Sequence, residues 1–178
     1  MASSSPVLIP AIAKWIWNIR PETILDVGVG FGRYGFLCRE ILDVWSSRYF
    51  KKDWKVRIDG VEIFPDFITD VHRYLYDSIF IEDINVFINK MDNYDLVIFG
   101  DVLEHMQKDA ALNLVKETRK KCKWILIQSP VGEMKQDVVL GNVYEKHLSA
   151  FYPEDFLEYY PQVEINNNIF IVLIRGEL

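Results

Sequence analysis

The sequence predicts an α/β domain organised around a mostly parallel β-sheet. Short apolar runs rich in branched residues alternate with longer segments of helical period, which is the order of strands joined by crossover helices. Closely spaced glycines follow the first run, where such a sheet turns from strand to helix. Two adjacent strand-like runs end the chain. We therefore expect a three-layer α-β-α sandwich with a seven-stranded, mostly parallel sheet and a C-terminal antiparallel hairpin.

The first expected element is an N-terminal helix within residues 1–22. Ile12, Ile16 and Ile19 recur at helical spacing, so one apolar face can dock against the sheet. The stretch does not resemble a secretion signal, because no basic segment precedes it, Lys14 interrupts it and no small-residue cleavage site follows.

Strand-like runs follow this helix at residues 23–29, 55–63, 78–83, 94–100 and 123–130. The last two runs of the chain lie within residues 162–176, around Asn166, Asn167 and Asn168. Asparagine tolerates the positive φ of tight turns, so this end of the chain is expected to fold as a hairpin.

Helical segments are expected between the strands. After the first strand, one helix face is formed by Leu37, Ile41, Val44 and Trp45. A second helix is expected over residues 65–77, and a short amphipathic piece follows the third strand. Before the fifth strand, the inner face of a further helix is formed by Ala111, Leu114, Val115 and Thr118.

Composition limits the class of protein. The 178 residues suit one domain spanning 1–178, and 50% hydrophobic residues are enough for a substantial core. Cys38 and Cys122 lie far apart, which favours the reducing cytoplasm over a disulfide framework or a zinc knuckle. The net charge of −6 disfavours a nucleic-acid partner, and no stretch approaches the roughly 20 apolar residues of a membrane span. The oligomeric state stays open.

The glycine turn, residues 28–35, is the first candidate binding site. Gly28, Gly30 and Gly32 permit positive φ and let a ligand approach the backbone closely, next to a helix start with free N–H groups. The alternative is a turn that is merely tight. Gly30 to Gly35 also match the dinucleotide pattern G-x-G-x-x-G, whereas the register from Asp26 places a carboxylate before the glycines. There it could receive an ammonium group and would repel a pyrophosphate.

In this second register the sequence resembles the class I, Rossmann-like S-adenosylmethionine-dependent methyltransferases, whose first motif is an acidic residue followed by G-x-G-x-G. The resemblance implies that Asp26 and the three glycines hold the amino-acid end of the cofactor. It also implies a ribose-binding acid at the end of the second strand, matched by Glu62 with Ile63 beside it. Asp83 and Ile84 match the positions that hold the adenine, although Asp83 can equally cap the helix that follows.

A further marker lies after the fourth strand, in the segment "DVLEHM". Asp101, Glu104 and His105 crowd the carboxyl end of this strand, and many small methyltransferases carry D-V-L-E-H there. The resemblance adds Asp101 to the expected cofactor contacts. No Asn/Asp-Pro-Pro-aromatic segment follows, and no Pro-Cys marks a base-attacking cysteine. We therefore expect a small-molecule acceptor.

Residues 130–152 form a long segment without clear period, and loops of this length are commonly functional. Within this expected active-site loop, His147 and Ser149 match a His-x-Ser-x-aromatic run of related methyltransferases, with Phe151 in place of the common tryptophan. Phe151 and Tyr144 could instead simply pack the loop down.

The sequence thus predicts methyl transfer from S-adenosylmethionine, with a hydroxyl oxygen as the expected acceptor. A hydroxyl must also lose a proton, for which histidine is the natural base, and His105 and His147 are the catalytic candidates. His72 lies on the helix after the second strand and is expected to be structural. No metal is predicted, because no cluster has metal-ligand spacing in the sequence. Two alternatives remain: an NAD(P)-dependent oxidoreductase using the other glycine register, and a noncatalytic nucleotide-binding protein.

Overall fold

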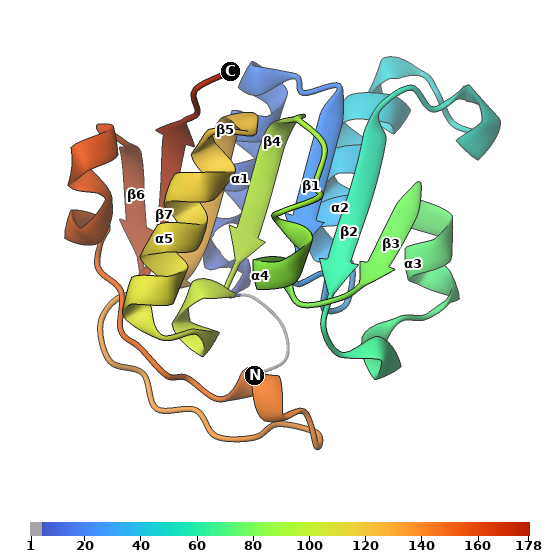
Figure 1. Cartoon of the computed structure of the whole chain (residues 1–178). Helices are drawn as coiled ribbons and strands as arrows, with labels where there is room; N and C mark the ends of the chain where they lie inside the picture. The colour runs from blue at the N-terminus through green and yellow to red at the C-terminus, as the bar shows by residue number, and fades with distance from the viewer. Residues whose placement is uncertain (1–4) are drawn as a thin grey trace.

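The structure, a computed structural model, describes residues 5–178. Its sheet has seven strands in the order β3-β2-β1-β4-β5-β7-β6 (Figure 1). The strands are β1 Thr23–Val27, β2 Arg57–Glu62, β3 Ser78–Ile81, β4 Tyr94–Gly100, β5 Cys122–Pro130, β6 Gln162–Asn166 and β7 Ile169–Arg175. Strands β1 to β5 run parallel, and β7 is antiparallel to both β5 and β6. The predicted sheet and its C-terminal hairpin are confirmed.

Helices cover both faces of this sheet. They are α1 Ile9–Ile19, α2 Arg33–Cys38, α3 Asp70–Leu75, α4 Ile84–Phe87 and α5 Lys108–Arg119. Shorter 3₁₀ or π turns are η1 Pro6–Leu8, η2 Arg39–Asp43, η3 Val44–Ser46, η4 Lys51–Asp53, η5 Pro65–Phe67, η6 Leu103–His105, η7 Val143–Glu145 and η8 Pro153–Tyr159. The first four residues of the expected 1–22 segment lie outside the described residues.

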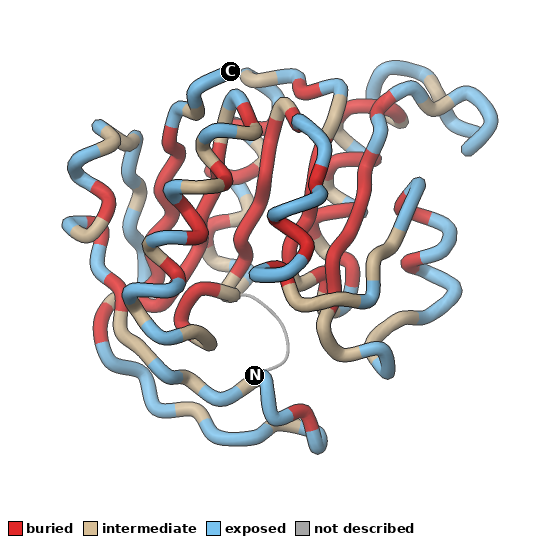
Figure 2. Tube along the Cα trace, viewed as in Figure 1, coloured by how far each residue is buried: buried red, intermediate tan, exposed pale blue. Residues whose placement is uncertain are grey.

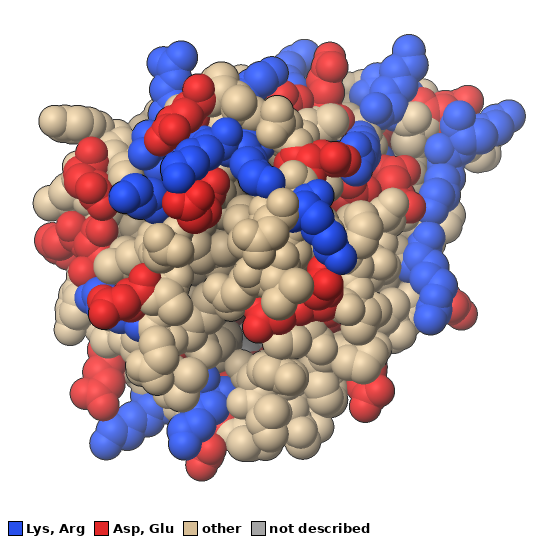
Figure 3. Space-filling model, in the orientation of Figure 1, with Lys and Arg blue, Asp and Glu red and all other residues tan. Residues whose placement is uncertain are grey.

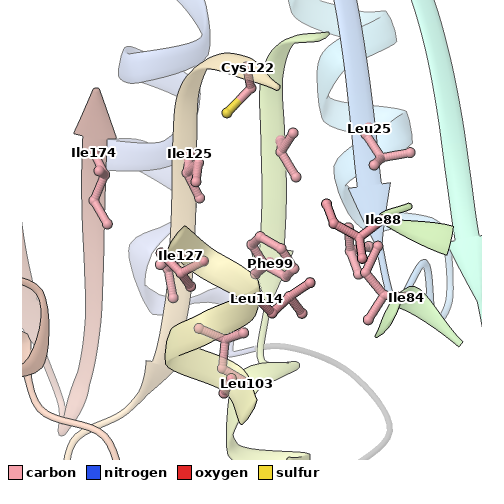
Figure 4. Close-up of a cluster of buried hydrophobic side chains, with 14 of the residues drawn as sticks. Leu25, Ile84, Ile88, Phe99, Leu103, Leu114, Cys122, Ile125, Ile127 and Ile174 are labelled. Atoms are coloured by element: carbon pink, nitrogen blue, oxygen red, sulfur yellow. The ribbon is translucent and has the colours of Figure 1, made fainter. Parts of the chain in front are cut away.

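Two apolar layers hold the sandwich together. On one face, Leu114 of α5 and Ile84 and Ile88 at α4 pack over strand residues such as Phe99 and Ile127 (Figure 4). The predicted inner face of α5 is buried as expected. On the opposite face, α1 and α2 pack against the other side of the same strands. The central strands are therefore buried along their length, as Figure 2 shows.

The helix after β1 differs from its prediction. Its buried hydrophobic side chains are Tyr34, Cys38 and Leu42, and Trp45 from the predicted face is 72% exposed. The buried face includes the polar residues Arg39 and Asp43, which lie in η2, a π turn that continues α2. Arg39 itself is 2% exposed and forms ion pairs with two aspartates, Asp43 at 2.9 Å and Asp77 at 2.7 Å. An ion-paired arginine thus occupies a buried position, which a pattern of hydrophobic residues does not predict.

The single helix expected over residues 65–77 is also divided. Thr69 has an extended backbone between η5 and α3, where it forms a capping box with His72. The hairpin turn, in contrast, follows its prediction, because Asn167 and Asn168 both have positive φ, at 48° and 59°.

Candidate active site

A cavity of about 590 Å³ opens at the carboxyl ends of the parallel strands. Strand order reverses between β1 and β4, and open α/β sheets bind ligands at this kind of switch point. The glycine turn, the strand-end acids of β2 and β3, and η6 contribute to the wall. Residues of the 130–152 loop, which runs below these strand ends in Figure 1, complete it. The volume lies within the range of small-molecule sites. In the orientation of Figure 1, charged side chains of both signs gather over the upper part and edges of the molecule, while its middle is mostly uncharged (Figure 3).

The glycine turn brings bare backbone to the cavity. Gly28 has a φ of 70°, and a Cβ at this position would lie 2.6 Å from Val102 Cγ2. Gly30 also has a positive φ, of 50°, and both glycines line the cavity. Gly32 does not line it; this residue is the N-cap of α2 and packs beside His72. Two of the three predicted glycines therefore face the site.

Buried side chains form hydrogen bonds with both the N–H and the carbonyl of Gly30. Its N–H donates to Glu62 Oε2 at 3.2 Å, while Glu62 Oε1 accepts the N–H of Phe64 at 2.9 Å. The Gly30 carbonyl accepts a bond from His72 Nε2 at 2.8 Å. Because His72 Nδ1 accepts the N–H of Thr69, the ring proton must lie on Nε2. His72 is thus structural, as predicted, although the sequence gives no sign of its partner in the turn.

Asp26 lies behind the glycine turn, outside the cavity lining. Its carboxyl is fully buried, and Tyr76 donates a hydrogen bond to Oδ2 at 2.6 Å. Burial raises the pKa of Asp26 to about 7, opposed by the Tyr76 bond and assisted by the nearby Glu62. Within residues 5–178, the second carboxylate oxygen, Oδ1, has no hydrogen-bond partner. The expected contact of Asp26 with an ammonium group therefore stays a prediction.

The acids at the ends of β2 and β3 do line the cavity, together with Ile63 and Ile84. Burial raises the pKa of Glu62, while backbone N–H groups lower it. Asp83 is the N-cap of α4, and its Oδ1 accepts the backbone N–H and side-chain amide of Asn85, each at 2.8 Å. The capping role considered from the sequence is present, and it leaves the residue at the cavity wall.

Asp101 closes the wall after β4 with a positive φ of 54°. Its Oδ2 accepts bonds from Gln128 Nε2 at 2.9 Å and from the Ser5 N–H at 3.3 Å. Ser5 and Pro6 line the cavity as well. Sequence reasoning missed this N-terminal contribution, because no local pattern connects these residues with β4 or β5.

At the other end of the cavity, Glu104, His105 and His147 come together. The two imidazole rings are 4.9 Å apart, and the potential ligand atoms of the three side chains lie within 4.8 Å of one another. Glu104 is 2% exposed; Ser129 Oγ donates to its Oε2 at 3.2 Å, and within residues 5–178 its Oε1 has no hydrogen-bond partner. Burial raises the pKa of Glu104 well above its usual range and lowers the pKa of His105 to about 4. The structure thus brings the two catalytic candidates, His105 and His147, side by side.

Backbone contacts attach the 130–152 loop to η6. The Glu104 carbonyl accepts the N–H groups of Leu148 at 2.8 Å and Ser149 at 3.2 Å. Ser149 Oγ also donates to the Met106 carbonyl at 2.7 Å. Phe151 is fully buried and anchors the end of the loop. The His-x-Ser-x-aromatic run thus consists of one residue at the cavity and two that hold it there.

Comparison with known proteins identifies the fold. Neither a protein-family model nor a curated protein sequence matches the chain. Among solved structures, an O-methyltransferase family protein from Burkholderia thailandensis superposes on 96% of the chain with a TM-score of 0.65 and 12% identity. The match to TehB from Haemophilus influenzae covers 97% of this chain, with a TM-score of 0.68 and 16% sequence identity. The match to the S-adenosylhomocysteine complex of DhpI covers 96% of this chain, with a TM-score of 0.70 and 12% sequence identity.

The chain has the class I S-adenosylmethionine-dependent methyltransferase fold. It spans 56% of the Burkholderia protein, 64% of TehB and 86% of DhpI. In this methyltransferase fold, the glycine turn and the paired histidines line one cavity. None of the helices within residues 5–178 has the length and apolarity required to cross a membrane.

Proposed function

We propose that the protein is an S-adenosylmethionine-dependent methyltransferase (EC 2.1.1.-) that moves a methyl group to a hydroxyl oxygen of a small molecule in the cytoplasm. One observation carries the proposal: a single cavity joins the glycine turn and strand-end acids to a pair of histidines. The S-adenosylhomocysteine bound by DhpI, which has the same fold, supports the choice of cofactor.

The cofactor is proposed to lie along the strand ends. Asp83 and Ile84 would contact the adenine, with Glu62 and Ile63 at the ribose. Each oxygen of a carboxylate has two acceptor positions, so Glu62 can hold Gly30 and Phe64 and still accept bonds from a ribose diol. The amino-acid end would then lie against the backbone of Gly28 and Gly30 and the nearby Asp101.

This placement directs the methyl group toward the histidines. Transfer from a sulfonium is a direct displacement, so in-line positioning and exclusion of water do most of the work. His105, His147 and Tyr144 line the same cavity, so an acceptor hydroxyl would meet the methyl group beside the two histidines. Either imidazole could receive the hydroxyl proton, provided that it is not engaged otherwise.

Ligand titration tests the cofactor assignment. Calorimetry should show binding of S-adenosylhomocysteine and little binding of NADH; tighter NADH binding would favour the oxidoreductase alternative. Glu62→Ala should weaken S-adenosylhomocysteine by about ten- to a hundred-fold, because it removes a charged hydrogen-bond acceptor. Glu40→Gln, which removes an exposed acid outside the cavity, is the matched control.

Turnover is tested separately. Purified protein would be incubated with methyl-labelled S-adenosylmethionine and a small-molecule extract, and labelled products would be separated from unreacted cofactor. A labelled product that requires Glu62 supports the proposal. Cofactor binding without any labelled product across extracts would favour the noncatalytic alternative.

A further inference from the structure

Glu104, His105 and His147 form a cluster whose donor types match those of a transition-metal site. Two imidazoles and one carboxylate are the ligand set of several catalytic zinc sites, in which a fourth position stays open. We propose that these three side chains bind one divalent transition-metal ion of the Zn²⁺ type at the acceptor end of the cavity. The carboxylate carries the strongest evidence, because Glu104 is 2% exposed and its Oε1 has no hydrogen-bond partner within the described residues.

Both imidazoles are oriented for ligation. His147 Nδ1 lies 2.7 Å from the Met134 carbonyl, and His105 Nδ1 lies 3.3 Å from the Lys146 carbonyl. A carbonyl oxygen only accepts, so each Nδ1 donates, which leaves the lone pair of a neutral ring on Nε2. His105 also has a backbone hydrogen-bond partner at Asp101, so His147 is the better oriented of the two rings. Metal-bound histidines commonly use their second nitrogen in this way, which fixes both tautomer and ring orientation.

The distances between the three candidate ligand atoms allow metal binding after the side chains move slightly closer together. Two ligands about 2.1 Å from a tetrahedral ion lie roughly 3.4 Å apart. The potential ligand atoms lie within 4.8 Å of one another, so each pair would approach by at most about 1.4 Å. The Glu104 carbonyl binds the N–H groups of Leu148 and Ser149, so His147 is held on the same turn that carries the other two ligands.

The ion would have an open position toward the cavity, because all three side chains line it. A small molecule bearing a hydroxyl group could occupy that position. Its role rests on the proposed function, whereas ion binding does not. The bound hydroxyl would release its proton to solvent more readily. Its oxygen would then form the O–C bond as the S–C bond breaks, leaving a neutral thioether, and both imidazoles would serve as ligands rather than bases.

Direct metal binding tests the site without any acceptor. Protein treated with a chelator and dialysed would be titrated with Zn²⁺ by calorimetry, and Co²⁺ would be added in parallel to record its visible absorption. We expect one equivalent of Zn²⁺ to bind, with affinity lowered about a hundred-fold or more in Glu104→Gln and His147→Gln. Glu133→Gln, which removes an exposed acid of the same loop, should bind like wild type.

The outcomes separate the two proposals. Equal Zn²⁺ affinity in wild type and the His147→Gln variant, or no wild-type binding at micromolar Zn²⁺, would overturn the metal site. His147 lies on a partly exposed loop, so this variant keeps the test valid even if Glu104→Gln fails to fold; circular dichroism checks both. S-adenosylhomocysteine affinity, measured on the same chelator-treated protein, tests the proposed function alone.

Discussion

The two ends of the cavity are built differently. At the glycine turn, buried side chains from other elements hold the backbone, with Glu62 and His72 binding opposite sides of Gly30. The 130–152 loop is attached mainly through backbone groups and exposes apolar side chains, including Leu140 at 76% and Val143 at 62%. One end of the site is therefore fixed by its surroundings, while much of the other is in contact with solvent.

This difference fits separate roles for the two parts of the site, cofactor binding at the glycine turn and substrate enclosure at the loop. A cofactor of constant shape is best served by a preorganised site, because little ordering is left to oppose binding. Loops that close over a substrate are drawn from regions with few buried contacts. Substitutions at the glycine turn should thus change cofactor affinity, whereas those in the loop should leave it nearly constant. The four predictions below, in order of decreasing expected effect, test this contrast.

The largest effect is expected from Gly28→Ala compared with Gly141→Ala. Both glycines have positive φ, of 70° and 78°, so both substitutions carry backbone strain of about 1–2 kcal/mol. Only at Gly28 would the new Cβ meet another side chain, Val102, at 2.6 Å. S-adenosylhomocysteine affinity, measured by calorimetry, should fall at least about 30-fold in Gly28→Ala and less than about two-fold in Gly141→Ala. Similar losses in both variants would contradict the contrast.

A pH-dependent stability difference is expected at Asp26. Its folded pKa of about 7 lies above the ordinary value of 3.8, so the folded state holds the proton more tightly. Stability from this group is present at low pH and is lost as pH rises toward 7, by a few kcal/mol at most. The groups facing it are Tyr76, Glu62 and the Cys38 thiol.

Thermal unfolding between pH 5 and pH 8 checks this expectation. The wild-type melting temperature should fall over that range by more than that of Asp26→Asn, which cannot titrate at this position. Parallel profiles for the two proteins would show that Asp26 keeps an ordinary pKa.

A smaller effect is expected from His72→Ala. The change removes the donor to the Gly30 carbonyl and the acceptor of the Thr69 N–H, both of them partly buried hydrogen bonds. Unfolding free energy should fall by about 1–3 kcal/mol, and S-adenosylhomocysteine affinity should fall a few-fold as the turn loosens. His72→Gln, whose amide can still donate, should recover part of the affinity. Unchanged affinity in the alanine variant would mean that the turn keeps its shape without this bond.

The smallest effect is expected from Ser149→Ala, at the opposite end of the cavity. Losing the bond to the Met106 carbonyl should cost about 0.5–1.5 kcal/mol of stability by denaturant unfolding. Cofactor affinity should change by less than about two-fold, because the loop does not hold the glycine turn. A ten-fold loss of S-adenosylhomocysteine affinity would show instead that the two ends are coupled.

Much of the fold could be predicted because its signals are local. Buried parallel strands such as β4 read as continuous apolar runs, and Asn167 and Asn168 mark the hairpin turn directly. The helix after β1 was wrongly oriented for a non-local reason. Its buried Arg39 forms ion pairs with Asp43, four residues later, and with Asp77, which lies after the next helix and cannot be identified as a partner from sequence spacing.

The predictions for the site show the same difference between local and long-range signals. Strand ends place Glu62, Asp83 and Asp101 at one edge of the sheet, so their gathering follows from topology. Asp26 was expected at the ligand; its carboxylate lies outside the cavity lining, and Tyr76 from a distant element donates to its Oδ2. The approach of His147 to Glu104 likewise depends on a loop path that no periodicity describes. Local patterns thus predict where polar groups emerge, and tertiary contacts decide which of them face the cavity.

The contact between Ser5 and Gln128 has a consequence for the order of events during synthesis. The Ser5 carbonyl accepts a bond from Gln128 across a sequence separation of 123 residues, and Ser5 forms part of the cavity wall. A growing chain is released at roughly 5–20 residues per second, so this stretch waits several seconds before its partner leaves the ribosome. The wall formed by Ser5 can therefore be completed only after β5 has been synthesised, late in translation.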